Sequence, residues 1–422
     1  MQHLLGKARK IGQWAAALPR AVRAVAGPGV RTYLAPLPEG YPAKRIRIDL
    51  SIPRVPHHAS FEFSEHVADA SGLPTDRVLA VSIGRFAISE DLGRSWRVTN
   101  IPESPSARIV HVKNLNSEEL LVQTVDESAS AKGELVDLSV VSTAGEILAH
   151  HPKMSVRWHG CRSVGLADGT LMFAEYPQNK DRQWISRVFR SRNAGRSWDV
   201  VFRQTGAEVR HFHFLQPRPG ARGEWWLTSG DHPHECRIWV SKDDGDTWVD
   251  LTAWAPDRIE IGGQILRGDM FRLTDLAWEP DSIVWATDDS LQQVRNGIPG
   301  ARVFRSPYAD KLQPREVGRG NWHFRSLVDI GSCYLLLSQG NPKGCTSRDD
   351  RAGVYLAPKV PLLDTQGLVH LFDIETYFPL RTRFTASRAS RAAKDGAFFT
   401  FRGRADVFVL GHRILKWCVG LE

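Results

Sequence analysis

An eight-residue pattern, Ser-x-Asp/Asn-x-Gly-x-Ser/Thr-Trp, occurs three times in this chain of 422 residues. The copies occupy residues 89–96, 191–198 and 241–248, and a short apolar run stands before and after each of them. A short Asp or Asn side chain accepts hydrogen bonds from backbone N–H groups two or three residues on, and Gly supplies the positive φ of a tight turn. Each copy therefore predicts a strand, a turn anchored by Trp, and a second strand.

The spacing of the copies indicates a repeated unit. They start at positions 89, 191 and 241, so the unit is about 50 residues long and one further unit fits between the first two copies. Residues 142–145 follow a strand-like run in that gap, and we interpret them as a degenerate copy that has lost its Asp and its Trp. Because each repeat buries its face against its neighbours, one domain can hold a chain of this length.

These turns resemble the Asp-box (BNR) repeats of sialidase-type β-propellers. The resemblance rests on three full copies of the motif at blade spacing. It implies an all-β fold and a single β-propeller, which we place over residues 44–422, with seven blades expected and six or eight as alternatives. It says little about function, because Asp-boxes lie on the outer rim of blades and stabilise the turn rather than bind substrate.

Hairpins of similar length follow along the chain. We expect units over residues 107–151, 157–203 and 209–252, hairpins over 271–306 and 322–356, and a last unit over 367–417 that N-terminal strands help to close. The segment 381–404 is rich in Arg and Lys. We interpret it as a solvated basic loop or insertion, with a contact to a polyanion as the alternative.

The composition supports an all-β chain and suggests a class of partner. The sequence has 14 Trp and 18 Phe against 4 Met, and strand-like runs far outnumber helical ones. A net charge of +8 favours polyanionic partners, although a basic solvated surface would give the same value. We expect an acidic glycan as the partner, and no nucleic acid. The five cysteines are odd in number and scattered, so they predict no disulfide framework.

The N-terminus is the one good candidate for a helix. Residues 1–26 place apolar side chains near a 3.6-residue period with basic residues between them, and a linker rich in Pro and Gly extends to residue 43. Such a basic amphipathic helix can bind an anionic membrane surface. A helix docked on the propeller and a disordered tail are the alternatives. The segment resembles neither a membrane span nor a secretory signal, which favours a cytoplasmic or peripheral membrane protein.

Four hairpins carry polar clusters at the start of their first strand and at the end of their second. They cover residues 158–176, 210–231, 273–289 and 322–339. Antiparallel pairing brings the start of one strand beside the end of the next, so both clusters of a hairpin lie at the same edge of its sheet. The first strand of a propeller blade lines the central channel, and we therefore expect these clusters to converge on one binding site.

The residue types in these clusters suit acid–base and anion chemistry. We expect catalytic roles for His211, His213, Asp231, Glu175, Tyr176 and Asp275. We expect substrate binding by His159, Arg162, Arg210, Asp288, His323 and Arg325. His211 and His213 are two residues apart and face one side of a strand, so with Asp231 they are candidates for a divalent metal site. The alternative is that these polar residues only satisfy backbone groups at the blade ends.

The residue types of this site fit two kinds of enzyme, sialidases and polysaccharide lyases. Sialidases use an arginine triad, a Tyr nucleophile supported by Glu, and an acidic acid/base. Glu175 and Tyr176 fit, but residues 51–54 only faintly echo the Arg-Ile-Pro motif of that family. Propeller polysaccharide lyases need a His or Tyr base and a cation beside the substrate carboxylate. We therefore predict a propeller that binds and cleaves an acidic polysaccharide or glycan, with a non-catalytic glycan-binding or protein-interaction propeller as the alternative.

Overall fold

A computed structural model describes most of the chain between residues 31 and 421. The described residues are 31–36, 39, 45–51, 62–68, 74–91, 95–102, 107–125, 135–156, 163–177, 179, 181–254, 258–261, 264–288, 302–320, 324–329, 333–338, 352–359, 368–374, 383–388, 396–402 and 415–421. The helix expected over residues 1–26 lies outside them. None of the described helices has the length and apolar character needed to cross a membrane.

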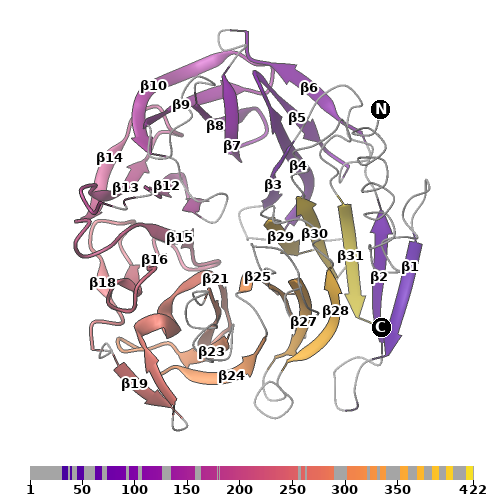
Figure 1. Cartoon of the computed structure of the whole chain (residues 1–422). Helices are drawn as coiled ribbons and strands as arrows, with labels where there is room; N and C mark the ends of the chain where they lie inside the picture. The colour runs from indigo at the N-terminus through magenta and orange to yellow at the C-terminus, as the bar shows by residue number, and fades with distance from the viewer. Residues whose placement is uncertain are drawn as a thin grey trace, which may run out of the picture. The chain divides into compact units, whose positions relative to one another are not determined.

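The chain is almost entirely β-structure and divides into two compact units. The larger unit comprises residues 54–288 and 304–315, and the remainder forms the smaller unit. Figure 1 shows the strands in chain order by colour. Most sheets in the described residues join strands that follow one another in sequence, as the repeat predicts, whereas one five-stranded sheet combines strands from both ends of the chain.

Four four-stranded sheets follow one another in the larger unit. The first holds β3 (Glu62–Ala68), β4 (Pro74–Ser82), β5 (Arg85–Ser89) and β6 (Arg97–Asn100). The second holds β7 (Arg108–Asn114), β8 (Glu119–Val125), β9 (Leu135–Ser142) and β10 (Ile147–Val156). The third holds β11 (Val164–Ala167), β12 (Thr170–Ala174), β13 (Ser186–Ser191) and β14 (Asp199–Gln204). The fourth holds β15 (Phe212–Pro217), β16 (Trp225–Ser229), β17 (Arg237–Ser241) and β18 (Val249–Asp250).

Shorter elements and three more sheets complete the described structure. The short helices are η2 (Pro233–Glu235) and η3 (Gly268–Phe271), and β19 (Arg258–Ile261) pairs with β20 (Gln264–Arg267). One sheet holds β21 (Leu273–Trp278), β22 (Ser282–Thr287), β23 (Arg302–Pro307) and β24 (Arg315–Arg319), and the next holds β25 (Phe324–Asp329), β26 (Cys333–Ser338), β27 (Ala352–Pro358) and β28 (Val369–Ile374). A five-stranded sheet has the order β1 (Arg31–Pro36), β2 (Arg45–Ser51), β31 (Leu415–Leu421), β30 (Gly396–Arg402) and β29 (Arg383–Arg388).

Consecutive sheets of the larger unit pack face to face through apolar side chains. Leu121 and Val140 of the second sheet share a buried cluster with Phe173 of the third, and Trp225 of the fourth packs with the opposite face of the third. Trp225 is fully buried. Removing a Trp ring from water contributes roughly 4–6 kcal/mol before conformational entropy is subtracted. Each sheet is therefore stabilised by its neighbours, as expected of a repeat protein.

The three predicted turns share one hydrogen-bond pattern. In residues 241–248, Asp243 Oδ1 accepts from Ser241 Oγ at 2.8 Å and from the Thr247 backbone N–H at 2.8 Å. Asn193 makes the equivalent contacts in residues 191–198, at 2.9 Å each. Asp91 does the same in the first copy, at 2.7 and 2.8 Å. Gly245 has a φ of +86°, so the backbone takes the left-handed conformation that the motif predicts.

The turns 191–198 and 241–248 also lie against the sheet that precedes their own. A Cβ on Gly245 would lie 2.8 Å from Met172 Cε in the third sheet, and one on Gly195 would lie 2.9 Å from Val140 Cγ2 in the second. The degenerate turn 142–145 occupies the equivalent place, because a Cβ on Gly145 would clash with the Asn100 carbonyl oxygen of the first sheet. This turn lacks the Asp and the Trp of the motif but keeps the contact between its Gly and the preceding sheet.

A register shift recurs near the start of the first strand in five sheets. It falls between Phe63 and Glu65, Ile109 and His111, Phe212 and Phe214, Leu273 and Asp275, and Phe324 and Ser326. A β-bulge of this kind leaves one residue out of the ladder and bends the strand locally. In the fourth sheet that residue is His213.

Two expectations for the ends of the chain are wrong. The stretch expected as a linker contains β1, which pairs along its length with β2. The segment 381–404 contains β29 and β30, which pair with each other as a hairpin instead of forming a loop. The Arg content of this segment obscured its Phe and Thr residues, which favour strands. The last expected unit is consequently divided, since β28 belongs to the preceding sheet. The blade count stays a prediction.

Candidate functional site

The pairing of β15 with β16 brings two polar clusters to one edge of the fourth sheet. Phe212 pairs with Ser229, so His211 and Asp231 lie just beyond the paired residues on neighbouring strands. The sheet that starts with β21 repeats the arrangement, since the Asp288 backbone N–H donates to the Arg272 carbonyl at 2.8 Å. The expectation that each hairpin collects its polar residues at one edge is confirmed for these two hairpins.

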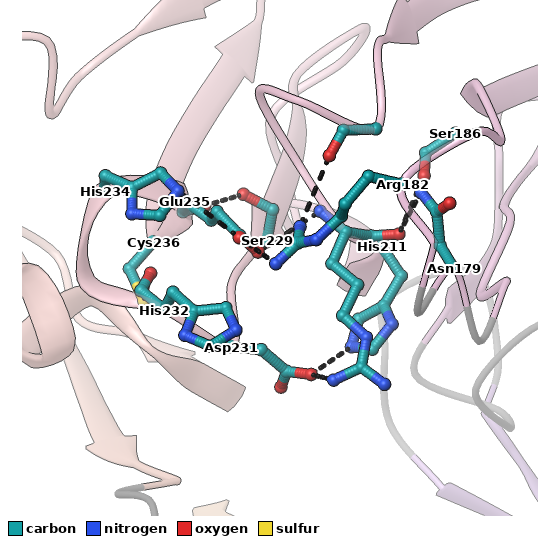
Figure 2. A network of polar contacts seen from close by, with 12 residues as sticks. Asn179, Arg182, Ser186, His211, Ser229, Asp231, His232, His234, Glu235 and Cys236 are labelled. Atoms are coloured by element: carbon teal, nitrogen blue, oxygen red, sulfur yellow. Dashed lines mark hydrogen bonds and ion pairs between the residues drawn. The ribbon is translucent and has the colours of Figure 1, made fainter.

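The carboxylate of Asp231 is the centre of the site. Its Oδ2 lies 2.5 Å from Arg210 Nη1 and 3.3 Å from His211 Nε2. Its Oδ1 lies 3.0 Å from Arg272 Nη2 and 3.6 Å from His213 Nε2. Each oxygen thus faces one guanidinium and one imidazole. Figure 2 shows the Asp231 side chain directed at His211, with the carboxylate in contact with a guanidinium as well.

The imidazole of His211 is held from two further sides. Its Nδ1 lies 3.0 Å from the carbonyl oxygen of Pro177, and the ring of Tyr176 stacks on it with centroids 3.9 Å apart. The His213 ring is 5.0 Å from that of His211, so the bulge leaves both imidazoles facing Asp231 as the spacing predicts. We call Tyr176, Arg210, His211, His213, Asp231 and Arg272 the rim cluster. All six belong to the larger unit.

Burial and charge set the protonation states of this cluster. His211 is only 2% exposed, and burial lowers its pKa below the ordinary value because desolvation outweighs the attraction of Asp231. Burial by itself raises the pKa of Asp231, but its interactions with the adjacent imidazoles of His211 and His213 reverse this and hold the pKa far below its usual range. Arg210 and Arg272 add fixed positive charge. At neutral pH the site therefore holds a carboxylate and a neutral His211.

The loop between β12 and β13 supports the site from the third sheet. Asn179 Nδ2 donates to the Arg210 carbonyl at 3.2 Å, and Arg182 forms an ion pair of 2.5 Å with Glu235. Glu235 has no exposed surface, and its Oε2 accepts from the Arg210 backbone N–H at 3.2 Å. Figure 2 shows these contacts beside Ser229, whose Oγ donates to the Glu235 carbonyl at 2.5 Å. They fix the backbone of Arg210, the residue before His211.

Several candidates from the sequence lie elsewhere or in other contacts. Both carboxylate oxygens of Glu175 bind Arg187, at 2.8 and 2.7 Å, so this carboxylate serves an ion pair between neighbouring strands. Asp275 is buried and accepts from the Leu276 backbone N–H at 3.0 Å. Asp288 lies 3.9 Å from Arg272 and so borders the rim cluster. His159, Arg162 and His323 lie outside the described residues, as does the side chain of Arg325.

Sequence reasoning missed three contributors to the site. Arg272 follows η3, and Asn179 and Arg182 come from a loop that carries no motif. The signals that could have identified them are the polar content of that loop and the position of Arg272 one residue before a hairpin already under consideration.

Comparisons with known proteins support the fold. No protein-family model matches the sequence, and no curated protein does. Among solved structures, oligogalacturonate lyase in complex with manganese is 12% identical with a TM-score of 0.52, over 94% of this chain and 97% of that one. YCF48 bound to D1 peptide is 11% identical with a TM-score of 0.50, over 92% and 99%.

A third solved structure covers a different share of its own chain. An ancestral GH74 enzyme is 14% identical, with a TM-score of 0.51. The match covers 86% of this chain but only 47% of that protein. The neighbours are β-propellers, and at these identities they show the fold alone. This chain is therefore a β-propeller. Its assignment to the Asp-box family stays a prediction.

Proposed function

We propose that this propeller binds and cleaves an acidic, uronate-containing glycan at the rim cluster. The observation that carries the proposal is the position of Asp231, whose two oxygens each face one imidazole and one guanidinium. Groups that accept protons and groups that neutralise anions are thus gathered within hydrogen-bond reach at one sheet edge. Such gatherings of titratable groups are typical of functional sites.

The residue types match β-elimination at a uronate. In that reaction a base removes the proton on the carbon next to the carboxylate, the electrons form a double bond, and the glycosidic oxygen leaves with a proton. The step needs a base and positive charge at the carboxylate. Tyr176 is half-buried against His211 and supplies the base in this proposal, while Arg210 and Arg272 supply positive charge.

Two of the structural neighbours act on glycans by their names, the oligogalacturonate lyase and the GH74 enzyme. The first of these names a uronate substrate, which agrees in kind with the charge of the rim cluster. A protein-interaction function is the second candidate, because YCF48 is bound to a peptide in its structure. In that case the rim cluster would bind an acidic side chain or a chain terminus and transform nothing.

A screen of acidic glycans separates these functions. Polygalacturonate, alginate and hyaluronan are incubated with the protein while the absorbance of the unsaturated uronate and the number of reducing ends are followed. Tyr176→Phe keeps the stacking on His211 and removes the hydroxyl. We expect it to slow cleavage by a factor on the order of 100 and to change glycan affinity little.

The matched control is Asp168→Asn, in the exposed turn between β11 and β12. Asp168 has a φ of 50°, which Asn tolerates, so the variant keeps the turn while changing a charge far along the sheet from the site. Equal losses in Tyr176→Phe and Asp168→Asn would contradict the proposal. So would a protein that neither binds nor cleaves any acidic glycan, and a positive peptide screen would then favour the alternative.

A further inference from the structure

The rim cluster contains three side chains of the kinds that bind transition metals. His211, His213 and Asp231 each offer one donor atom, and the three atoms lie within 4.8 Å of one another. Both imidazoles are buried, and Asp231 is 14% exposed on the side chain. The donors therefore converge at a point that is mostly protected from bulk water, where only Asp231 is partly exposed.

The hydrogen bond of His211 fixes which of its nitrogens carries a proton. The Pro177 carbonyl can only accept, so Nδ1 of His211 must donate across their 3.0 Å contact. In a neutral imidazole the other nitrogen, Nε2, then presents a lone pair. That lone pair has no hydrogen-bond donor and lies 3.3 Å from Asp231 Oδ2, which is also an acceptor. These two electron-pair donors face each other, and a cation that binds both would satisfy the arrangement.

A metal ion meets this requirement better than a proton does. One proton can bridge only one imidazole to the carboxylate, whereas one metal ion accepts electron pairs from both imidazoles and from Asp231 together. In a tetrahedral site with metal–nitrogen and metal–oxygen distances of about 2.1 Å, adjacent donors are about 3.4 Å apart. His211 Nε2 lies 3.3 Å from Asp231 Oδ2 and His213 Nε2 lies 3.6 Å from Oδ1 of the same carboxylate, and one donor atom from each residue lies within 4.8 Å of the others.

The contacts around His211 and Asp231 are of the kind found around metal ligands. A metal-binding His usually donates its other ring N–H to a carbonyl or carboxylate, and a ligating carboxylate is itself hydrogen-bonded. His211 donates to Pro177, and Asp231 accepts from Arg210 and Arg272. The Tyr176 ring stacks on the His211 imidazole and restricts its rotation. This second layer of contacts is independent of the convergence of the donors.

We propose that His211, His213 and Asp231 bind one first-row divalent metal ion. Two imidazoles and one carboxylate suit Mn²⁺, Fe²⁺, Co²⁺ or Zn²⁺, and three protein ligands leave at least one coordination position for another group. If the proposed function holds, that position takes the uronate carboxylate. The role of the ion rests on that function, while the metal site itself stands independently.

Direct binding measurements test the site. The full-length protein is stripped with a chelator and titrated with MnCl₂ or ZnCl₂ by calorimetry, and the retained metal is quantified by mass spectrometry after gel filtration. We expect one ion per chain for the wild type. His211→Ala and His213→Ala should each weaken binding at least tenfold. Substitution by Co²⁺ gives an absorption spectrum that reports nitrogen and oxygen ligands directly.

The exposed pair His232 and His234 provides the control. Their rings stack 6.1 Å apart, and His234 is 57% exposed, so they are the nearby histidines that could bind a metal adventitiously. The double variant His232→Ala/His234→Ala should retain the ion. Loss of the ion in this variant would overturn the proposal, as would a wild-type protein that retains less than about a tenth of an equivalent. The wild-type titration decides even if a variant fails to fold.

The experiments distinguish failure of the proposed metal site from failure of the proposed function. A stoichiometric ion in a protein that binds no acidic glycan would leave the site standing and refute the proposed function. Full cleavage by the stripped protein, with no response to added metal, would refute the role of the ion and leave the proposed function standing.

Discussion

The two ends of the fourth sheet satisfy their polar groups in different ways. At one end, residues 241–248 satisfy their polar groups within the turn, and residues 191–198 repeat the arrangement contact for contact. At the other end, Asp231 depends on side chains from the neighbouring sheet and from the strand beside it. The repeated end carries local stability, whereas the unrepeated end concentrates charge that only long-range packing can hold. Recurrence in the sequence therefore indicates architecture, and the part that departs from it is where we propose the site.

The largest expected effect is at the unrepeated end. Asp231→Ala leaves Arg210 and Arg272 without their shared carboxylate, and breaking a buried ion pair typically costs 3–5 kcal/mol. Since Arg210 is 22% exposed, we expect a loss of about 3 kcal/mol in the free energy of unfolding. Denaturant unfolding measures it.

Asp246→Ala is the matched variant at the repeated end. Asp246 also lies 2.5 Å from an Arg, Arg190, but its side chain is 55% exposed. We expect a smaller loss, because solvent screens the exposed carboxylate and because Arg190, although only 8% exposed, still donates to the Asp244 carbonyl at 2.8 Å. If the two variants lost equal stability, burial would not be what separates the two ends.

The next effect concerns the Trp of the turn. Trp248 is half-buried, packs 5.5 Å from the Phe202 ring and donates from Nε1 to the Gly245 carbonyl at 3.1 Å. Trp248→Ala should lower the free energy of unfolding by about 2 kcal/mol, below the usual range for a fully buried aromatic. Metal and glycan binding of the folded protein should be unchanged. A binding defect equal to that of His213→Ala would show that the two ends are coupled.

A smaller loss is expected for Gly245→Ala. The φ of +86° disfavours any side chain, and the new Cβ would press on Met172 Cε at 2.8 Å. The Met side chain is flexible, so strain in the backbone dominates, at about 1–2 kcal/mol. Gly169→Ala is the comparison, since Gly169 has a φ of +81° and no atom within 4 Å of a Cβ. The difference between the two variants in thermal unfolding isolates the contact with the preceding sheet.

The smallest effect is a dependence of stability on pH. Hydrogen bonds from Thr247 lower the pKa of Asp243 below its ordinary value. A lowered pKa in the folded state stabilises the protein above the unfolded pKa, and this contribution is lost as the pH falls through the folded value. Asn193 occupies the same position in residues 191–198 and does not titrate. Asp243→Asn should therefore lose less stability than the wild type between pH 6 and about pH 3. An unchanged pH profile of the unfolding midpoint would contradict this.

The sequence was most informative where it repeats. Three turns, their hydrogen-bonding residues and the units around them follow from the motif and the spacing, and the antiparallel rule placed His211 beside Asp231. Arg272 and Arg182 could not be found in this way, because their contacts depend on how one sheet packs on another. Glu175 has the residue type of a catalytic group, and only its distance to Arg187 shows that it forms a structural ion pair.

The bulge near the start of the first strands has a consequence for how such a chain can change. The residues at the five register shifts are Ser64, Val110, His213, Thr274 and Arg325. Because a bulged residue has no partner directly opposite it in the ladder, a change of its side chain disturbs no direct cross-strand pair. Val110 holds this position in the second sheet, where its side chain is 6% exposed. An imidazole introduced there would occupy the position that His213 has in the fourth sheet.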